Sequence, residues 1–168
     1  MKITRVETLV LNLPMTIDGP APLLGGRART SIDMLLVRVE TDGGVVGWGE
    51  AFGHRIFHAT RAAIDTVLGP MCVGRDPAQI LAINDEFQRV LHGIGRNGPT
   101  MYALSGIDIA LWDIAGKVAG QPLYRVLGGG ARADLPAYAS LLRYGTADAV
   151  TRYTAQALGR GYRHLKLH

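Results

Sequence analysis

The residue pattern of the last quarter of the chain predicts a strand, a helix and a second strand. This pattern restricts the fold more than any other feature of the sequence. Residues 135–140 and 162–168 favour β-strands, and residues 147–158 between them favour a helix. A helix that connects two strands in this way places them parallel in one sheet. Two parallel strands and one helix cannot bury their own apolar faces. We therefore expect further strands to complete this sheet.

A glycine-rich junction precedes this region. Gly128, Gly129 and Gly130 stand where the composition changes, which is typical of a domain boundary. The sequence therefore predicts one domain over residues 1–130 and the start of a second over residues 131–168.

The first 50 residues predict a small antiparallel meander. Residues 2–12, 34–39 and 45–50 are strand-like, and a turn around Gly43 joins the last two segments. Residues 13–31 contain several Pro and Gly and show no helical or strand periodicity. A connection of this length is uncommon in a compact domain unless it is a lid or a binding loop, and the alternative is disorder.

Three helices are predicted after the meander. The first covers residues 56–68 and is closed by Gly69 and Pro70, and the second begins with Asp76 as N-cap and Gln79 completing a capping box. The third follows Pro99 and ends at Gly120, and we expect it to be the best-buried helix. The expected buried faces are Ile80, Ile83, Phe87, Val90 and Leu91 on the second helix, and Leu104, Ile107, Leu111, Ile114 and Val118 on the third.

Composition excludes several classes of protein. The single cysteine, Cys72, forms no internal disulfide and no multi-cysteine zinc site, and we expect it to be a small buried residue. The net charge is +4, but the basic residues are scattered singly, which argues against nucleic acid and would suit an anionic substrate. No apolar run is long enough to span a membrane. These features predict a cytoplasmic protein.

Residues 103–132 carry a specific resemblance. Their sequence, ALSGIDIALWDIAGKVAGQPLYRVLGGGAR, closely resembles the segment that links capping domain and barrel in mandelate racemase-like enzymes of the enolase superfamily. The segments MKITRVET, VRVETDGGVVGWGEA and LPAYAS resemble the same branch, which also contains muconate lactonizing enzymes. The resemblance implies an α+β capping domain, with a three-stranded antiparallel meander plus helices, followed by the first βαβ unit of a modified TIM barrel. We expect the chain to stop before this barrel is complete.

The resemblance also implies Mg²⁺ bound by acidic residues at the ends of the third, fourth and fifth barrel strands. Those strands would lie beyond His168, so we expect no metal ligand within this chain. Asp108 and Asp113 are interpreted as structural, because Asp113 can pair with Lys117 four residues later on the same helix. Trp112 is interpreted as a packing residue.

The final strand segment holds the two predicted catalytic residues, Lys166 and His168. Alternate residues of a strand share a face, so both would point to the barrel interior near its C-terminal end, where TIM-barrel active sites lie. The family pattern is lysine, any residue, lysine, and its second lysine commonly removes the proton next to a substrate carboxylate. Here His168 replaces that lysine. His168 would act as the base while Lys166 supplies positive charge, or His168 would orient the ligand and a later strand would supply the base.

Four further residues are predicted to bind substrate. Tyr138 and Ser140 alternate along the first barrel strand toward the same end. Arg27 and His54 lie in segments that resemble the two family loops closing over substrate, and each is equally well explained as a solvated surface residue.

The predicted activity is magnesium-dependent removal of the proton alpha to a carboxylate, giving an enediolate, in an acid-sugar dehydratase. A racemase, epimerase or cycloisomerase of the same family is the alternative. If the 168 residues are the whole product, a non-catalytic binding module is favoured. The expected partners are a small carboxylate such as a sugar acid and, from the resemblance, further copies of the chain in a homo-oligomer. Nucleic acid and membrane are not expected.

Overall fold

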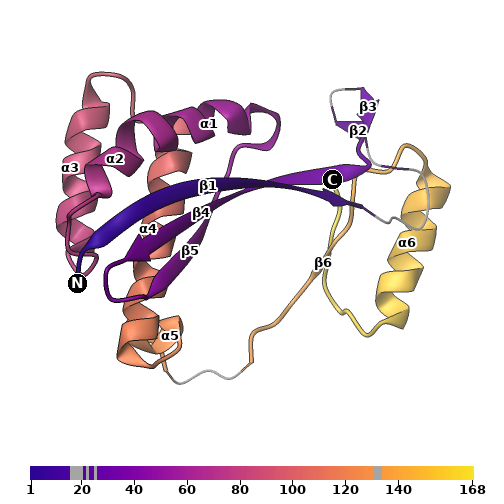
Figure 1. Ribbon diagram of the computed structural model, residues 1–168. Helices are drawn as coiled ribbons and strands as arrows, with labels where there is room; N and C mark the ends of the chain where they lie inside the picture. Colours follow the sequence, from indigo (N-terminus) through magenta and orange to yellow (C-terminus); the bar gives the residue numbers. More distant parts are fainter. Residues whose placement is uncertain (16–20, 22, 25, 131–133) are drawn as a thin grey trace. The chain divides into compact units, whose positions relative to one another are not determined.

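The computed structural model describes residues 1–168 except 16–20, 22, 25 and 131–133, and the chain divides into two compact units (Figure 1). The first unit contains Met1–Leu13 and Ile32–Gly130, and the second contains Pro14–Ser31 and Ala131–His168. Each unit is described separately below. No helix of the described residues is long and apolar enough to cross a membrane.

The first unit is built on the predicted three-stranded antiparallel sheet, with the order β1 (Ile3–Pro14), β4 (Ser31–Thr41) and β5 (Val46–Ala51). All three strands are confirmed, and β1 and β4 extend beyond the predicted segments. Every second residue of β4 from Leu35 onward is buried, because alternate side chains point to the helical side of the sheet. On the opposite face, Arg38 donates a hydrogen bond of 2.8 Å to Glu7.

The first helical region continues through Pro70, and the prediction that it ends there was wrong. It consists of the 3₁₀ turn η1 (His54–Ile56), α1 (Phe57–Ala63), the π-helical segment η2 (Ile64–Leu68) and α2 (Gly69–Cys72). The wider turn of η2 changes the hydrogen-bond register, so that Pro70 stands in the first turn of α2. A missing N–H is tolerated at that position, and the chain therefore remains helical.

The second predicted helix, α3 (Ile80–His92), begins later than expected. Asp76 accepts a hydrogen bond of 3.0 Å from the backbone N–H of Ala78, so its carboxylate stabilises the turn before α3 and the predicted capping box does not form. A local bond of this kind competes with helix capping. The prediction that Val90 is buried was wrong, because 41% of its surface is exposed. The other predicted residues of this face are buried: Ile80, Ile83, Phe87 and Leu91.

Helix α4 (Gly98–Ala119) lies directly against the sheet. A Cβ atom added to Gly49 of β5 would lie 2.0 Å from the carbonyl oxygen of Gly106, so only glycine fits this contact. The helix ends as predicted at Gly120, whose φ of 61° is left-handed. The short helix α5 (Leu123–Val126) follows. Val118 was wrongly predicted as buried, and the confirmed buried residues of the stripe are Leu104, Ile107, Leu111 and Ile114.

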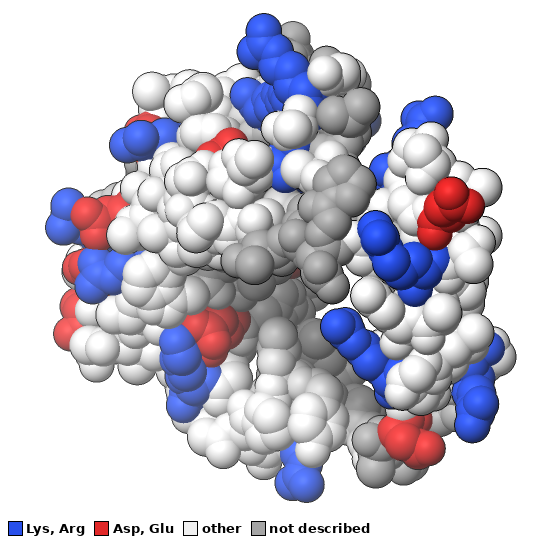
Figure 2. All heavy atoms as spheres, turned by 90° about the vertical axis from the view of Figure 1, so that its right-hand side faces the viewer, with Lys and Arg blue, Asp and Glu red and all other residues white. Residues whose placement is uncertain are grey.

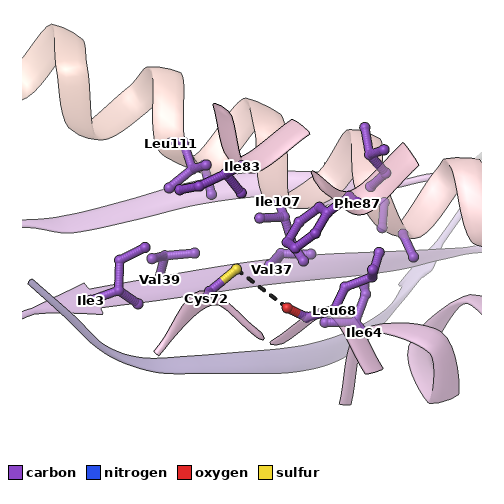
Figure 3. Packing of buried hydrophobic residues seen from close by; sticks show 14 of the residues in the cluster. Ile3, Val37, Val39, Ile64, Leu68, Cys72, Ile83, Phe87, Ile107 and Leu111 are labelled. Carbon is purple, nitrogen blue, oxygen red and sulfur yellow. Dashed lines mark hydrogen bonds between the residues drawn. The ribbon is translucent and has the colours of Figure 1, made fainter. Parts of the chain in front are cut away.

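The core of this unit lies between α4, α3, the first helical region and the sheet (Figure 3). Cys72 is fully buried there, as predicted, and its Sγ lies 3.4 Å from the carbonyl oxygen of Leu68. Burial removes water from the thiol and raises its pKa to about 12, although the charge of Arg75 opposes the shift. Trp112 packs against this core, which agrees with its predicted role.

The acidic residues of α4 hold neighbouring elements together. Asp113 accepts a hydrogen bond of 2.8 Å from the backbone N–H of Trp48 and pairs with Lys117 at 2.6 Å. Lys117 also donates to the carbonyl oxygen of Val46 at 2.7 Å. Asp108 accepts a bond of 2.5 Å from Asn84 of α3. Both carboxylates are therefore structural.

The second unit contains the predicted strand, helix, strand pattern, formed by β6 (Ala139–Ser140), α6 (Ala147–Gly159) and β7 (Leu165–Lys166). The two strands are parallel, as predicted, and shorter than their sequence segments. The hydroxyl of Thr146 accepts a bond of 3.3 Å from the N–H of Ala149 and caps α6.

This unit also contains a short antiparallel hairpin, β2 (Leu23–Leu24) and β3 (Arg27–Ala28). Residue patterns did not predict this hairpin, because two residues per strand are too few to show alternation. Much of the remaining predicted loop, including residues 16–20, 22 and 25, lies outside the described residues.

Candidate functional site

The candidate site lies where the parallel strands β6 and β7 end. Ser140 and Lys166 are register partners in the two strands, so their side chains stand on the same face. His168 follows Lys166 by two residues, and its Nε2 atom lies 3.3 Å from the Oγ atom of Ser140. The structure thus brings Ser140, Lys166 and His168 together on one face, as strand alternation predicts.

All three of these side chains are exposed. An ammonium group attracts a carboxylate, an imidazole can accept or donate a proton near neutral pH, and a hydroxyl can do both with an oxygen ligand. The arrangement is chemically suited to holding an anionic oxygen beside a proton acceptor. The catalytic roles of Lys166 and His168 stay predictions.

Tyr138 precedes Ser140 by two residues, in the segment that leads into β6, and its side chain is 54% exposed. It is open to solvent and to ligands. Its contact with substrate stays a prediction.

Arg27 and His54 lie in different units. Arg27 belongs to β3 of the second unit and is exposed. His54 belongs to the first unit and has a left-handed φ of 42°, a conformation that non-glycine residues rarely adopt. Substrate contacts of both residues stay predictions.

The ring of His54 is held in an aromatic cluster. It meets the edge of Phe52 at 4.5 Å between ring centroids, and Phe52 meets Tyr102 of α4 at 5.0 Å. Sequence analysis missed Tyr102, because a contact between residues 50 positions apart leaves no local spacing pattern. His54 and Phe52 are nevertheless exposed, with 50% of the surface of Phe52 accessible to solvent.

The described residues do not fit a magnesium site. Among them, no three His, Cys, Asp or Glu side chains gather closely enough to hold a metal ion. Figure 2 shows basic side chains scattered over one face, with fewer acidic ones between them.

Comparison with known proteins places the chain in a family. Residues 5–128 match the family described as "Mandelate racemase / muconate lactonizing enzyme, N-terminal domain". The chain belongs to this family. The resemblance carried by residues 103–132 is thereby confirmed.

Known proteins resemble the chain over nearly all of its length. A D-galactonate dehydratase family member from Catenulispora acidiphila is 41% identical over 171 residues, which cover 99% of this chain and 35% of that protein. An enolase superfamily member from Polaromonas sp. JS666 is 33% identical with a TM-score of 0.88, covering 100% of this chain and 44% of that one.

A third family relative was solved with magnesium. This mandelate racemase/muconate lactonizing enzyme-type protein from Roseovarius nubinhibens ISM is 33% identical with a TM-score of 0.81, and the match covers 98% of this chain and 43% of that one. The chain thus spans about a third of the length of its curated relative and under half of the two structural relatives. The fold of a capping domain followed by the first βαβ unit of a modified TIM barrel agrees with these matches.

Proposed function

We propose that the full-length protein removes the proton alpha to the carboxylate of an acid sugar and then eliminates the β-hydroxyl group as water. The observation that carries this proposal is the grouping of Ser140, Lys166 and His168 at the strand ends. A D-galactonate dehydratase family member with 41% identity supports dehydration as the outcome. The chain's own contribution is the base and a positive charge.

In the proposed reaction the imidazole of His168 accepts the α-proton. The carbon–hydrogen bond breaks, a nitrogen–hydrogen bond forms, and the electron pair moves onto the carboxylate to give an enediolate. The ammonium of Lys166 stabilises that negative charge because it stands on the same face of the strand pair. Collapse of the enediolate then breaks the bond between the β-carbon and its hydroxyl group, which takes a proton from solvent and leaves as water. Tyr138 and Ser140 would contact the substrate at the strand ends, and Arg27 and His54 would contact it from the capping loops.

We propose that the full-length enzyme requires magnesium, and the relative complexed with magnesium supports this. Bound Mg²⁺ stabilises negative charge on substrate oxygens as a Lewis acid. Its ligands would lie on strands beyond His168. We also propose that the enzyme is cytoplasmic and that it forms a homo-oligomer.

Racemisation or epimerisation is the second candidate function. The magnesium-containing relative carries the racemase family name, and reprotonation of the same enediolate on the other face would invert the α-carbon. The steps up to the enediolate are identical, so the same residues serve both reactions to that point, and inversion would need a second acid on the other face of the substrate.

The test uses the protein as its gene encodes it, incubated with a panel of acid sugars and Mg²⁺ in D₂O. Proton NMR follows exchange of the α-proton, and product analysis separates dehydration from inversion. His168→Ala should slow exchange by about 10²- to 10⁴-fold, the usual contribution of a general base. His92→Ala removes an exposed histidine at the end of α3 and is the matched control, with no expected change. Unchanged exchange in His168→Ala would refute the proposed base, and no turnover of any acid sugar by the natural protein would favour a binding module.

A further inference from the structure

The hydrogen bond between Ser140 and His168 determines which ring nitrogen of the histidine is open to a substrate. It joins Oγ of Ser140 in β6 to Nε2 of His168, which follows β7, at 3.3 Å. The bond thus crosses the pair of parallel strands at the candidate site. A neutral imidazole has one N–H donor and one lone pair, so the partner of one nitrogen determines the chemistry of the other.

Two arrangements satisfy this hydrogen bond. In the first, Nε2–H of His168 donates to the hydroxyl of Ser140, and the lone pair of Nδ1 stays open. In the second, the hydroxyl donates to Nε2, the proton of the ring lies on Nδ1, and neither nitrogen offers an open lone pair. A general base needs an open lone pair within reach of the proton that it removes. The first arrangement is the one compatible with catalysis.

We propose that Ser140 is a positioning residue, which accepts a hydrogen bond from Nε2 of His168 and thereby makes Nδ1 the nitrogen that removes the α-proton. This inference rests on the proposed function. As the carbon–hydrogen bond breaks, the proton forms a bond to Nδ1 and the electron pair moves to the substrate carboxylate. The imidazolium keeps its Nε2–H bond to Ser140, so the ring holds one orientation before and after proton transfer.

The same arrangement leaves the hydroxyl hydrogen of Ser140 available. Ser140 is in register with Lys166 on the shared face, so its hydroxyl donates to a substrate oxygen beside the ammonium group. One serine therefore connects the base to the bound substrate. This role includes the predicted contact between Ser140 and substrate and adds control over the tautomer of His168.

The kinetic test compares Ser140→Ala and Ser140→Thr in the protein as its gene encodes it. Loss of one hydrogen bond should slow α-proton exchange about five- to tenfold in Ser140→Ala. Threonine keeps the hydroxyl and should restore most of the rate, because a strand accommodates its branched side chain. Thr151→Ala, which removes an exposed hydroxyl from α6 of the same unit, is the matched control and should leave the rate unchanged.

The spectroscopic test does not depend on turnover. With ¹⁵N-labelled histidine, two-bond ¹H–¹⁵N correlations report which nitrogen of His168 carries the proton, and His168→Gln assigns the signal. The natural protein should show the Nε2–H tautomer, and Ser140→Ala should convert it to a mixture. A proton on Nδ1 in the natural protein, or an unchanged tautomer in Ser140→Ala, would overturn the positioning role. Exchange that survives in His168→Gln would refute His168 as the base, and with it the role of Nδ1, whereas the tautomer measurement tests the bond from Ser140 separately.

Discussion

The two units bury their apolar residues to different extents. In the first unit, the facing residues of β4, α3 and α4 form one core, and the large side chains at its centre are almost inaccessible to water. In the second unit, β6 and β7 share a two-residue ladder, and apolar residues beside it are open, with Leu135 78% and Leu167 60% exposed. The proposed catalytic residues, Lys166 and His168, lie in the second unit. The main apolar core and the proposed base are thus located in different parts of this chain.

The same substitution made in both units should show this difference at its largest. Leu111→Ala removes a fully buried side chain of α4 and should lower the free energy of unfolding by about 3 kcal/mol. Leu167→Ala removes an exposed side chain and should change it by less than about 0.5 kcal/mol. Urea denaturation of the two variants measures both values. Equal losses would contradict the comparison.

The close contact between β5 and α4 should tolerate no added methyl group. Gly49→Ala places a Cβ atom 2.0 Å from the carbonyl oxygen of Gly106, so sheet and helix must separate, at a cost of about 2 to 3 kcal/mol. Gly93→Ala is the control, because a Cβ atom there meets no heavy atom within 4 Å and the backbone is already helical. Thermal unfolding followed by circular dichroism should show a lower midpoint for Gly49→Ala alone.

The carboxylate of Asp113 should contribute more than an ordinary surface ion pair. Asp113→Ala leaves the N–H of Trp48 without its acceptor and Lys117 without its partner, and should cost about 1.5 kcal/mol. Asp85→Ala breaks an exposed pair with Arg89 and should cost less than about 0.5 kcal/mol. If chemical denaturation gives the same loss for both, the bond to β5 adds nothing to stability.

The smallest expected effect concerns Cys72 and alkaline pH. Burial raises its pKa from 9.0 to about 12, so the folded protein holds this proton more tightly than the unfolded chain. The stabilisation is complete below pH 9 and is lost as pH rises from there toward 12. Raising the pH from 7.5 to 9.5 should lower the free energy of unfolding by about 1 kcal/mol. Cys72→Ala should lack this component, and an identical pH dependence in both proteins would exclude it.

Much of the fold follows from residue periodicity. In β4, buried and less buried residues alternate over several pairs of residues. In α4, the apolar stripe from Leu104 to Ile114 repeats over several helical turns, so both burial patterns are visible in the sequence. The failures occur where a single contact decides the structure. Pro70 stays helical because a π turn precedes it. Asp76 accepts a hydrogen bond from the N–H of Ala78 in the preceding turn and does not cap α3.

The candidate site divides in the same way. Alternation along a strand predicted that Lys166 and His168 share a face, and the parallel pattern predicted a neighbouring strand. Neither pattern could predict the register of the two strands. The register pairs Ser140 with Lys166 and brings Ser140 within hydrogen-bond distance of His168. The ring contacts of His54 with Phe52 and of Phe52 with Tyr102 depend on long-range packing in the first unit and left no local signal.

The bonds from Asp113 and Lys117 to the backbone of β5 also bear on self-association. An unpaired strand edge is a template for strands from other molecules and a frequent start of aggregation. Here the N–H of Trp48 and the carbonyl oxygen of Val46 are already bonded to side chains of α4. A strand approaching along β5 finds these two groups occupied. The helix that completes the core therefore also protects the sheet against growth along β5.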